Sequence, residues 1–268
     1  MRIKVPYYFI GLVSIFFVVL SCTQKEETYW DSIVHNEEST AVAMLFTSTL
    51  LPPAGTFGPP LLDSIREGLI SGINPKQVHC ISLYPQVTDP LYNPKAETLL
   101  FRYNDAGDDT FEDYPSFVNN FQIFNFDIEG FKQSIRDFQA EDTPIGVGAV
   151  LTSNGKNLDI YISLKYLEQY SKDHGIVVYL YRKEKTAPQK VLPNTEQSDF
   201  VHKNLLIDFI TPDQGQKIVG TYEKDWENRY ELRYAVEGED IENIGVLTYV
   251  CELDASGKFS RMINSYSN

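Results

Sequence analysis

The spacing of hydrophobic residues changes from a helical to an alternating pattern roughly halfway along the chain. In the first half, apolar runs typical of strands at Ala41–Phe46 and Val78–Leu83 flank a helical pattern at Pro59–Gly72. Proline suits the first turn of a helix and glycine its end, which fits both ends of this pattern. A strand, a helix and a strand at this spacing predict a βαβ unit.

The rest of the first half continues the α/β pattern. A short helix is predicted at Ala96–Tyr103, and Tyr114-Pro115 then leads a third strand. A cis-proline precedes the third strand of thioredoxin-like folds, so we predict that Pro115 follows a cis bond. Asp127 is placed to cap a one-sided helix whose apolar residues are Ile128, Phe131, Ile135 and Phe138. This order predicts an α/β thioredoxin-like domain over residues 40–143.

From Ile145 onward, apolar and polar residues alternate, which is the period of half-buried strands. Asn154-Gly155 lies between two such runs, Val147–Thr152 and Leu158–Leu164, and predicts a tight hairpin. Further strands are predicted at Ile176–Arg182, Asn204–Thr211, Arg229–Val236, Gly245–Leu253 and Phe259–Asn264. About seven short strands predict an all-β immunoglobulin-like sandwich over residues 144–268.

The loop that opens the first helix is the main candidate site. Thioredoxin-type folds hold a Cys-x-x-Cys pair there, in which a thiolate attacks a disulfide and the second sulfur resolves the product. Here that position carries Leu51, Pro52, Pro53 and Ala54, which makes it a degenerate redox motif. We therefore expect no catalytic residues and a protein that is not an enzyme. The helix N-terminus could attract an anion, but an ordinary packed loop is the simpler interpretation.

The start of the chain has the features of a bacterial lipoprotein signal. Residues 1–21 carry a charged start and an apolar run that is short for a membrane span. The run ends in Val19-Leu20-Ser21-Cys22, which resembles a lipobox. The thiol of Cys22 would then carry a diacylglyceryl group and its amine a further acyl chain such as palmitate, which together hold a protein firmly on a membrane. The alternative is a plain secretion leader with a chance cysteine.

Residues 22–39 are predicted to form a polar tether. Its beginning resembles the surface-export signal of Bacteroidetes lipoproteins, a lysine followed by acids, in the residues Gln24, Lys25, Glu26 and Glu27. A short polar spacer would have the same composition. A few apolar residues, Tyr29 and Trp30 among them, indicate a docking turn near its end. We expect an outer-membrane protein that is held by lipid and faces the cell exterior.

Composition and charge narrow the class of partner. The chain has 268 residues, of which 43% are hydrophobic, so two packed domains are feasible. The formal net charge of −14 argues against nucleic acid as a partner, because basic residues supply most of that affinity. Cys80 and Cys251 lie on buried-looking runs in different predicted domains. We interpret both as free core thiols, and a disulfide framework is not supported.

No cofactor is expected, and metal sites have weak support. An acid-rich loop at Asn104–Asp113 is a calcium candidate through Asp105, Asp108 and Asp109, because hard cations prefer clustered oxygens. It lacks the spacing of an EF-hand, and a solvated acidic loop explains it better. The four histidines are scattered, which argues against zinc. His202, just before a predicted strand, is interpreted as a hydrogen-bonded structural residue.

Several short motifs, taken in order, resemble one family. They are Phe46-Thr47 with Gly55-x-Phe57-Gly58-Pro59-Pro60, Tyr114-Pro115-Ser116-Phe117-Val118-Asn119, Phe200-Val201-His202-Lys203-Asn204 and Met262-Ile263-Asn264. The chain is similar in these to the Bacteroidetes outer-membrane lipoproteins called the twenty-eight-kilodalton outer-membrane protein family. The resemblance implies a lipid anchor, a thioredoxin-like domain, a following β-sandwich, and surface binding or adhesion. Many members keep cysteines in the first loop, where this chain has Leu51 and Ala54.

The leading hypothesis is a non-catalytic surface lipoprotein. Its partners would be the membrane, through the lipid on Cys22, and an unidentified protein or glycan ligand. One alternative is a thiol oxidoreductase or peroxidase, which requires an exposed Cys80 with a lowered pKa. Another is a structural subunit of a larger surface assembly.

Overall fold

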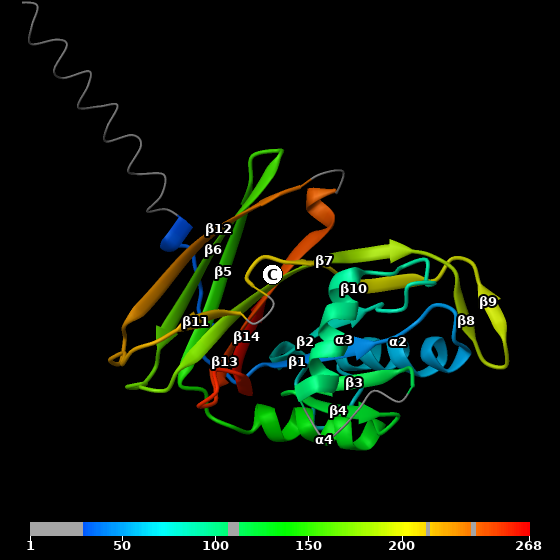
Figure 1. The fold of residues 1–268 in the computed structure, drawn as a ribbon, viewed down its shortest axis with the longest axis horizontal. Helices are drawn as coiled ribbons and strands as arrows, with labels where there is room; N and C mark the ends of the chain where they lie inside the picture. The colour runs from blue at the N-terminus through cyan, green and yellow to red at the C-terminus, as the bar shows by residue number, and fades with distance from the viewer. Residues whose placement is uncertain (1–28, 107–112, 213–214, 237–239) are drawn as a thin grey trace, which may run out of the picture.

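One nine-stranded sheet runs through both halves of the molecule (Figure 1). The computed structural model describes residues 29–106, 113–212, 215–236 and 240–268. The strands of the large sheet lie in the order β14-β13-β7-β10-β2-β1-β3-β4, and β11 pairs with β7. They are β1 Ala41–Phe46, β2 Val78–Leu83, β3 Ser116–Asn119, β4 Gln122–Asn125, β7 His174–Thr186, β10 Val201–Phe209, β11 Gln216–Ile218, β13 Ile244–Leu253 and β14 Phe259–Ser267.

Two smaller sheets and several helices complete the described part of the chain. A three-stranded sheet has the order β12-β6-β5, and β8 and β9 form a hairpin that contacts α2. These elements are α2 Pro52–Arg66, η1 Pro75–Gln77, α3 Pro94–Ala106, α4 Ile128–Gln139, β5 Ile145–Ser153, β6 Asn157–Tyr166, β8 Gln189–Val191, β9 Thr195–Gln197, β12 Glu227–Ala235 and η2 Ile241–Asn243. Among the described helices, none is long and apolar enough to cross a membrane.

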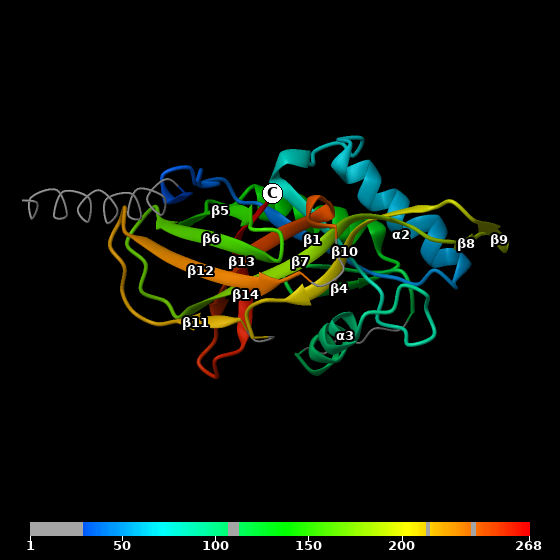
Figure 2. The same ribbon diagram turned by 90° about the horizontal axis from the view of Figure 1, so that it is seen from above.

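Strand β1 is buried on both faces, which explains why its sequence is apolar throughout rather than alternating. On one face, Leu45 packs beside Phe117 of β3, whose ring stacks on Phe131 of α4 with centroids 4.8 Å apart. On the other face, the ring of Phe46 meets Tyr103 of α3 edge to face at 6.0 Å. Helices α4 and α3 thus lie on opposite sides of the sheet. Gly58 of α2 lies against Leu45, so α2 is on the same side as α4, and Figure 2 shows it opposite α3.

The other half of the large sheet separates two hydrophobic cores. In β7, Val177 and Tyr179 belong to the core that the helices complete. The alternate residues Ile176 and Val178 belong to a second core, which the three-stranded sheet completes. This division follows from the alternation of side chains along a strand. The strands predicted for a sandwich therefore form two facing layers, but one of these layers continues into the sheet of the first half.

Most predicted elements are present, with some changes at their ends. Strands β1 and β2 occupy the predicted ranges, and the side chain of Asp127 accepts a hydrogen bond from Gly130 N at the start of α4. Helix α2 starts at Pro52, so the predicted start at Pro59 is wrong. The first two positions of a helix tolerate proline, which allows an earlier start. Strands β4, β8, β9 and β11, each three or four residues long, were not predicted.

The two halves of the large sheet join between β2 and β10, with little backbone pairing. Within these two strands the parallel register consists of one pair, Leu205 with Ser82. Asn204 has a left-handed backbone at φ +52°, and its side-chain amide donates to the Cys80 carbonyl at 2.8 Å. Ser82 Oγ donates to the Lys203 carbonyl at 3.0 Å. Side-chain hydrogen bonds thus replace part of the usual ladder at this seam.

Asn264 in β14 is fully buried and ties together segments that are far apart in the sequence. Its Nδ2 donates to the carbonyls of Asn36 at 2.9 Å and Ile145 at 3.0 Å. Its Oδ1 accepts from the backbone N–H of Thr40 at 3.0 Å and of Ser265 at 2.9 Å. The side chain thus uses two donor and two acceptor positions. It holds the starts of β1 and β5 against β14.

The first described residues dock on the outer face of the three-stranded sheet, as the predicted docking turn requires. The ring of Tyr29 stacks on Tyr161 of β6 with centroids 5.0 Å apart. Asn36 exchanges both backbone hydrogen bonds with Val147 of β5, at 2.8 and 3.1 Å. A Cβ on Gly148 would lie 2.6 Å from the backbone of this segment, so a glycine there allows the close approach.

We expect Asn264→Ala to lower the free energy of unfolding by about 2–4 kcal/mol, because it leaves buried backbone groups without partners. Guanidinium unfolding followed by circular dichroism measures this. Asn157→Ala, at the end of an exposed hairpin, serves as the matched control and should change stability by less than about 1 kcal/mol. Equal effects of the two substitutions would contradict the role given to Asn264.

Candidate functional site

The start of α2, where the sequence places its candidate site, is poor in hydrogen-bond donors. Leu51 is the N-cap residue, and its side chain makes no capping hydrogen bond. Pro52 and Pro53 follow it in the first turn and have no N–H, so two of the donors that bind anions at helix starts are missing. Ala54, in the place of a second cysteine, is fully buried. A packed helix start fits these residues better than an anion site.

The β8–β9 hairpin covers this helix start. The backbone N–H of Lys190 donates to the Thr49 carbonyl at 2.9 Å, and that of Leu192 donates to Thr56 Oγ1 at 2.8 Å. Gln189 is fully buried, and its side-chain amide donates to the same Thr49 carbonyl at 3.3 Å. The loop before α2 and its first turn thus bind β8 as an extended segment of the chain itself.

Two glycines of α2 allow its neighbours to approach closely. A Cβ on Gly55 would lie 2.2 Å from the carbonyl oxygen of Lys190, a distance at which atoms overlap. A Cβ on Gly58 would lie 3.3 Å from Pro115. The Tyr114–Pro115 bond is cis, the isomer that the sequence analysis expects. The loop, the hairpin and Pro115 therefore form one packed unit around the first turns of α2.

A buried carboxylate holds the loop that leads into α2. Asp89 is 4% exposed and accepts hydrogen bonds from Ser48 Oγ at 2.8 Å and from the Thr49 backbone N–H at 2.6 Å. It also accepts from Thr49 Oγ1 at 3.0 Å and from the Leu91 N–H at 2.8 Å. Hydrogen bonds to a charged group are stronger than neutral ones. The loop is therefore fixed rather than free to open around a substrate.

Both core thiols are buried and free, as the sequence analysis interprets them. Burial raises the pKa of Cys80 to about 11 and raises the pKa of Cys251 well above its usual value. The reactive thiolate is therefore scarce at neutral pH. The thiol oxidoreductase hypothesis needs an exposed Cys80 with a lowered pKa, and the structure gives it the opposite of both.

His202 is a structural residue, as predicted. Its ring is 1% exposed, with Nδ1 2.8 Å from the hydroxyl of Tyr84 and Nε2 3.2 Å from the carbonyl oxygen of Ala187. Burial lowers the pKa of His202 to about 4, so the ring is neutral at physiological pH. The His202 ring contacts the segment that leads into the β8–β9 hairpin, because Ala187 lies just before β8.

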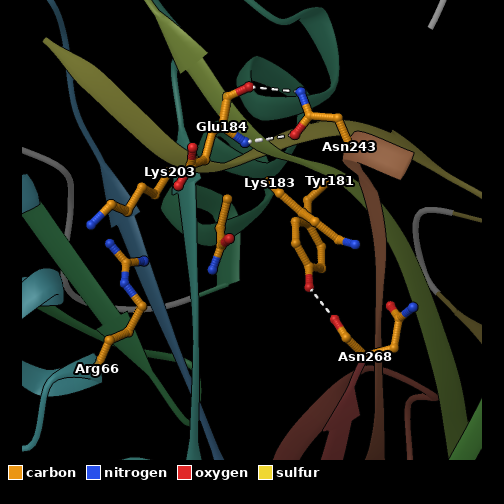
Figure 3. Close-up of a pocket in the computed structure, with 8 residues that line it drawn as sticks. Arg66, Tyr181, Lys183, Glu184, Lys203, Asn243 and Asn268 are labelled. Carbon is orange, nitrogen blue, oxygen red and sulfur yellow. Dashed lines mark hydrogen bonds between the residues drawn. The ribbon is translucent and has the colours of Figure 1, made fainter. Parts of the chain in front are cut away.

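A polar cleft opens beside β7 and β10 (Figure 3), next to the seam between β10 and β2. Its volume is about 470 Å³, and it adjoins a smaller cavity of about 120 Å³ beside Cys80. Ligand sites are usually clefts of about 300–1,000 Å³, so this is the candidate binding site. Its lining comes from five elements or their ends and consists of Arg66, Tyr181, Lys183, Glu184, Lys203, Asn204, Asn243 and Asn268.

Tyr181 forms one wall of the cleft. Its hydroxyl is 2.8 Å from Ser267 Oγ and donates to the Asn268 carbonyl at 2.8 Å. A Cβ on Gly245, its register partner in β13, would lie 2.2 Å from the ring. The ring therefore lies flat across Gly245, and a larger residue there would displace it toward the cleft.

The cleft is basic on a strongly acidic chain. Arg66, Lys183 and Lys203 line it together with a single carboxylate, Glu184, whereas the whole chain carries −14. Sequence reasoning missed this site because its residues come singly from distant segments and form no motif. Asn204, the first residue of a predicted strand, has a left-handed backbone and lines the cleft, and a sequence pattern does not reveal this conformation.

Several predicted site residues lie outside the described part of the chain. These are the lipid-attachment residue Cys22, the export signal Gln24–Glu27, and Asp108 and Asp109 of the calcium candidate; the side chain of Asp105 is also not described. Among the described residues, no group of three or more His, Cys, Asp or Glu side chains is placed to hold a metal ion.

Comparison with known proteins shows the fold and no family. No protein-family model matches the chain, and no curated protein matches it. HBP35 of Porphyromonas gingivalis has a similar structure, with a TM-score of 0.68 and 13% identity over 88% of this chain and 76% of that one. Protein AGR_C_4864 from Agrobacterium tumefaciens is also similar in structure, with a TM-score of 0.51 and 16% identity. The match covers 87% of this chain and 95% of that one. Porphyromonas gingivalis belongs to the Bacteroidetes, the group whose lipoproteins the sequence resembles.

We expect Cys80 and Cys251 to resist a thiol reagent in the native protein. With a pKa of about 11, Cys80 is about one part in a thousand thiolate at pH 8. In a Cys22→Ser variant, labelling should reach two thiols per chain in guanidinium and close to none before unfolding. Rapid native labelling of Cys80 would instead support the oxidoreductase hypothesis.

The free energy of unfolding should decrease as the pH falls from about 6.5 to about 4. His202 has a depressed pKa of about 4 in the fold, so in this window the unfolded chain binds more protons than the folded one. Unfolding titrations at several pH values measure the fall, and His202→Gln should make it shallower. Parallel pH curves for the two proteins would show that His202 does not contribute to it.

Proposed function

We propose that this protein is a lipid-anchored, non-catalytic binding protein of the outer membrane that faces the cell exterior. In this proposal Cys22 carries the lipid and the cleft at the seam holds the ligand. The observation that carries it is the β8–β9 hairpin, whose backbone occupies the approach to the helix start where redox chemistry would take place. A site that the chain's own backbone occupies is not accessible to a substrate.

The strand order and connections of the first half support a thioredoxin-like scaffold as part of this proposal. The neighbouring strands β2-β1-β3-β4 contain the parallel pair β1–β2 and the antiparallel pairs β1–β3 and β3–β4. Helix α2 connects the parallel pair, and Pro115 with its cis bond faces α2 before β3. The facing layers β12-β6-β5 and β10-β7-β13-β14 correspond to the immunoglobulin-like part. We infer a fused pair of these folds that share one sheet.

The location of the cleft suits a binding role. It lies where the two parts of the large sheet meet, a position at which separate elements contribute to one cavity. Its lining is rich in side chains that form hydrogen bonds, and it lacks the nucleophile and base pair that acyl or glycosyl transfer requires. A glycan or another polar molecule matches this lining better than an apolar one.

The tether would place the sandwich end of the molecule near the membrane. The described chain begins beside β6 and β12, at the opposite end from β8 and β9 (Figure 1). Six residues lie between Cys22 and Tyr29, so the seven Cα–Cα steps span at most about 25 Å when extended. The helices and the β8–β9 hairpin would then point away from the membrane, where an external ligand arrives.

Protease shaving of intact cells tests the location. We expect external protease to digest the wild-type protein and Cys22→Ala to be lost from the cells, because the acyl chains are its attachment. Protection of the wild type until the outer membrane is opened would contradict surface display.

A disulfide-exchange assay tests the non-catalytic part of the proposal. The wild type should reduce a protein disulfide no faster than a Cys80→Ser/Cys251→Ser double variant. A clearly faster wild type would support the oxidoreductase alternative, and the two experiments fail independently of each other.

A further inference from the structure

Arg66 lines the cleft, and one nitrogen of its guanidinium has no hydrogen-bond partner among the described residues. Arg66 is the last residue of α2, and its Nη2 pairs with the carboxylate of Asp63. Its Nη1 is buried and has no hydrogen-bond partner in the part of the chain that the structure describes. An unsatisfied buried donor raises the free energy of the folded protein. An acceptor that reaches this nitrogen from the cleft would remove that cost and so bind more tightly. In Figure 3 the guanidinium lies beside the ammonium group of Lys203, with which it shares the Asp63 carboxylate.

The charged groups around the cleft have a net charge of +1. Three cations line it, Arg66, Lys183 and Lys203. Asp63 pairs with both Arg66 and Lys203, the latter at 3.3 Å, and Glu184 stands exposed at the rim. Counting three cations against these two carboxylates gives a local charge of +1. A ligand with one negative charge would neutralise it.

Apart from the exposed Glu184 carboxylate and the side-chain oxygen of Asn204, the cleft offers a ligand mainly donors. The amide oxygen of Asn243 already accepts from the Glu184 N–H at 3.0 Å, and that of Asn268 from the Val246 N–H at 2.8 Å. Lys183 Nζ uses one N–H on the Glu242 carbonyl at 3.1 Å, which leaves two for a ligand. A site with spare donors and few spare acceptors selects acceptors, and oxyanions are the strongest of these.

We propose that the cleft binds a small polar ligand through a single oxyanion group, a carboxylate or a phosphate, that the Arg66 guanidinium contacts. This rests on the proposed binding function and names the chemistry of its ligand. Lys203, which shares the Asp63 carboxylate with Arg66, contacts the same group from beside Arg66, and Lys183 adds a further positive charge to the lining. The Tyr181 ring lies beside the rest of the ligand. Arginine suits this role because its planar guanidinium matches an oxyanion with two parallel N–H groups.

Calorimetric titration of the full-length protein in non-ionic detergent tests the proposal. The probes are glucuronate, inorganic phosphate and glucose, where glucose is the neutral counterpart of glucuronate. We expect at least one anion to bind with saturation, and glucuronate to bind at least about tenfold more tightly than glucose. Binding should weaken in higher salt, because part of the attraction is between charges near solvent.

Variants locate the binding to the cleft. Arg66→Gln should weaken anion binding about ten- to a hundredfold, as expected for loss of a charge-assisted hydrogen bond. Lys183→Gln, which leaves the Arg66–Asp63 pair intact, should weaken it less, and Gly245→Ala should weaken it by displacing Tyr181. Arg136→Gln on α4, whose guanidinium donates to the Ser71 carbonyl, is the matched control and should bind like the wild type.

The outcomes separate the two possible sources of the oxyanion. Saturable binding of glucuronate alone indicates a carboxylated sugar, and binding of phosphate alone indicates a phosphorylated ligand. Equal binding of glucose and glucuronate, unaffected by Arg66→Gln, overturns the oxyanion proposal but leaves the proposed binding function standing. The absence of saturable binding by either anion up to about 10 mM also overturns it, since that concentration exceeds the range expected of a specific site.

Discussion

The amide of Asn204 and the carbonyl of Cys80 hold together two parts of a sheet that barely pair through their backbones. Because Asn204 adopts a left-handed conformation, β10 cannot follow β2 along its full length, and the strands diverge. The divergence makes the seam the site of the cleft. The same residue therefore joins the two parts of the sheet and lines the cleft beside them.

Two cores share this sheet, which has consequences for how the molecule behaves as a whole. Strand β7 contributes alternate residues to each core, so neither core retains its full lining if the other unfolds. Proteins with two separate domains commonly have polar interfaces of modest size, and their domains move relative to each other. Here the interface is a continuous sheet with apolar side chains on both faces. We infer that the body unfolds cooperatively and that the cleft keeps a fixed shape.

The local pattern of the sequence predicts the strands and helices well and the site poorly. Alternation around Asn154-Gly155 identifies β5 and β6, and helical spacing after Asp127 identifies α4, because both signals lie within a few residues. The start of α2 was misplaced because prolines at both Pro52 and Pro59 give the same signal. Strands β8 and β9 were missed because they are short and mostly polar, and they form where α2 and its loop supply partners. The cleft depends on tertiary contacts of single residues such as Arg66, which carry no local pattern.

The pairing of Asn36 with Val147 matters for how the body would carry a mechanical load. If the chain is held at its beginning, a pull on the body reaches residue 29 first and must detach the stacked ring of Tyr29. It then meets the two backbone hydrogen bonds of Asn36 and the amide of Asn264, before any tension reaches β1. The docked segment would therefore bear the applied force before the strands of the large sheet do.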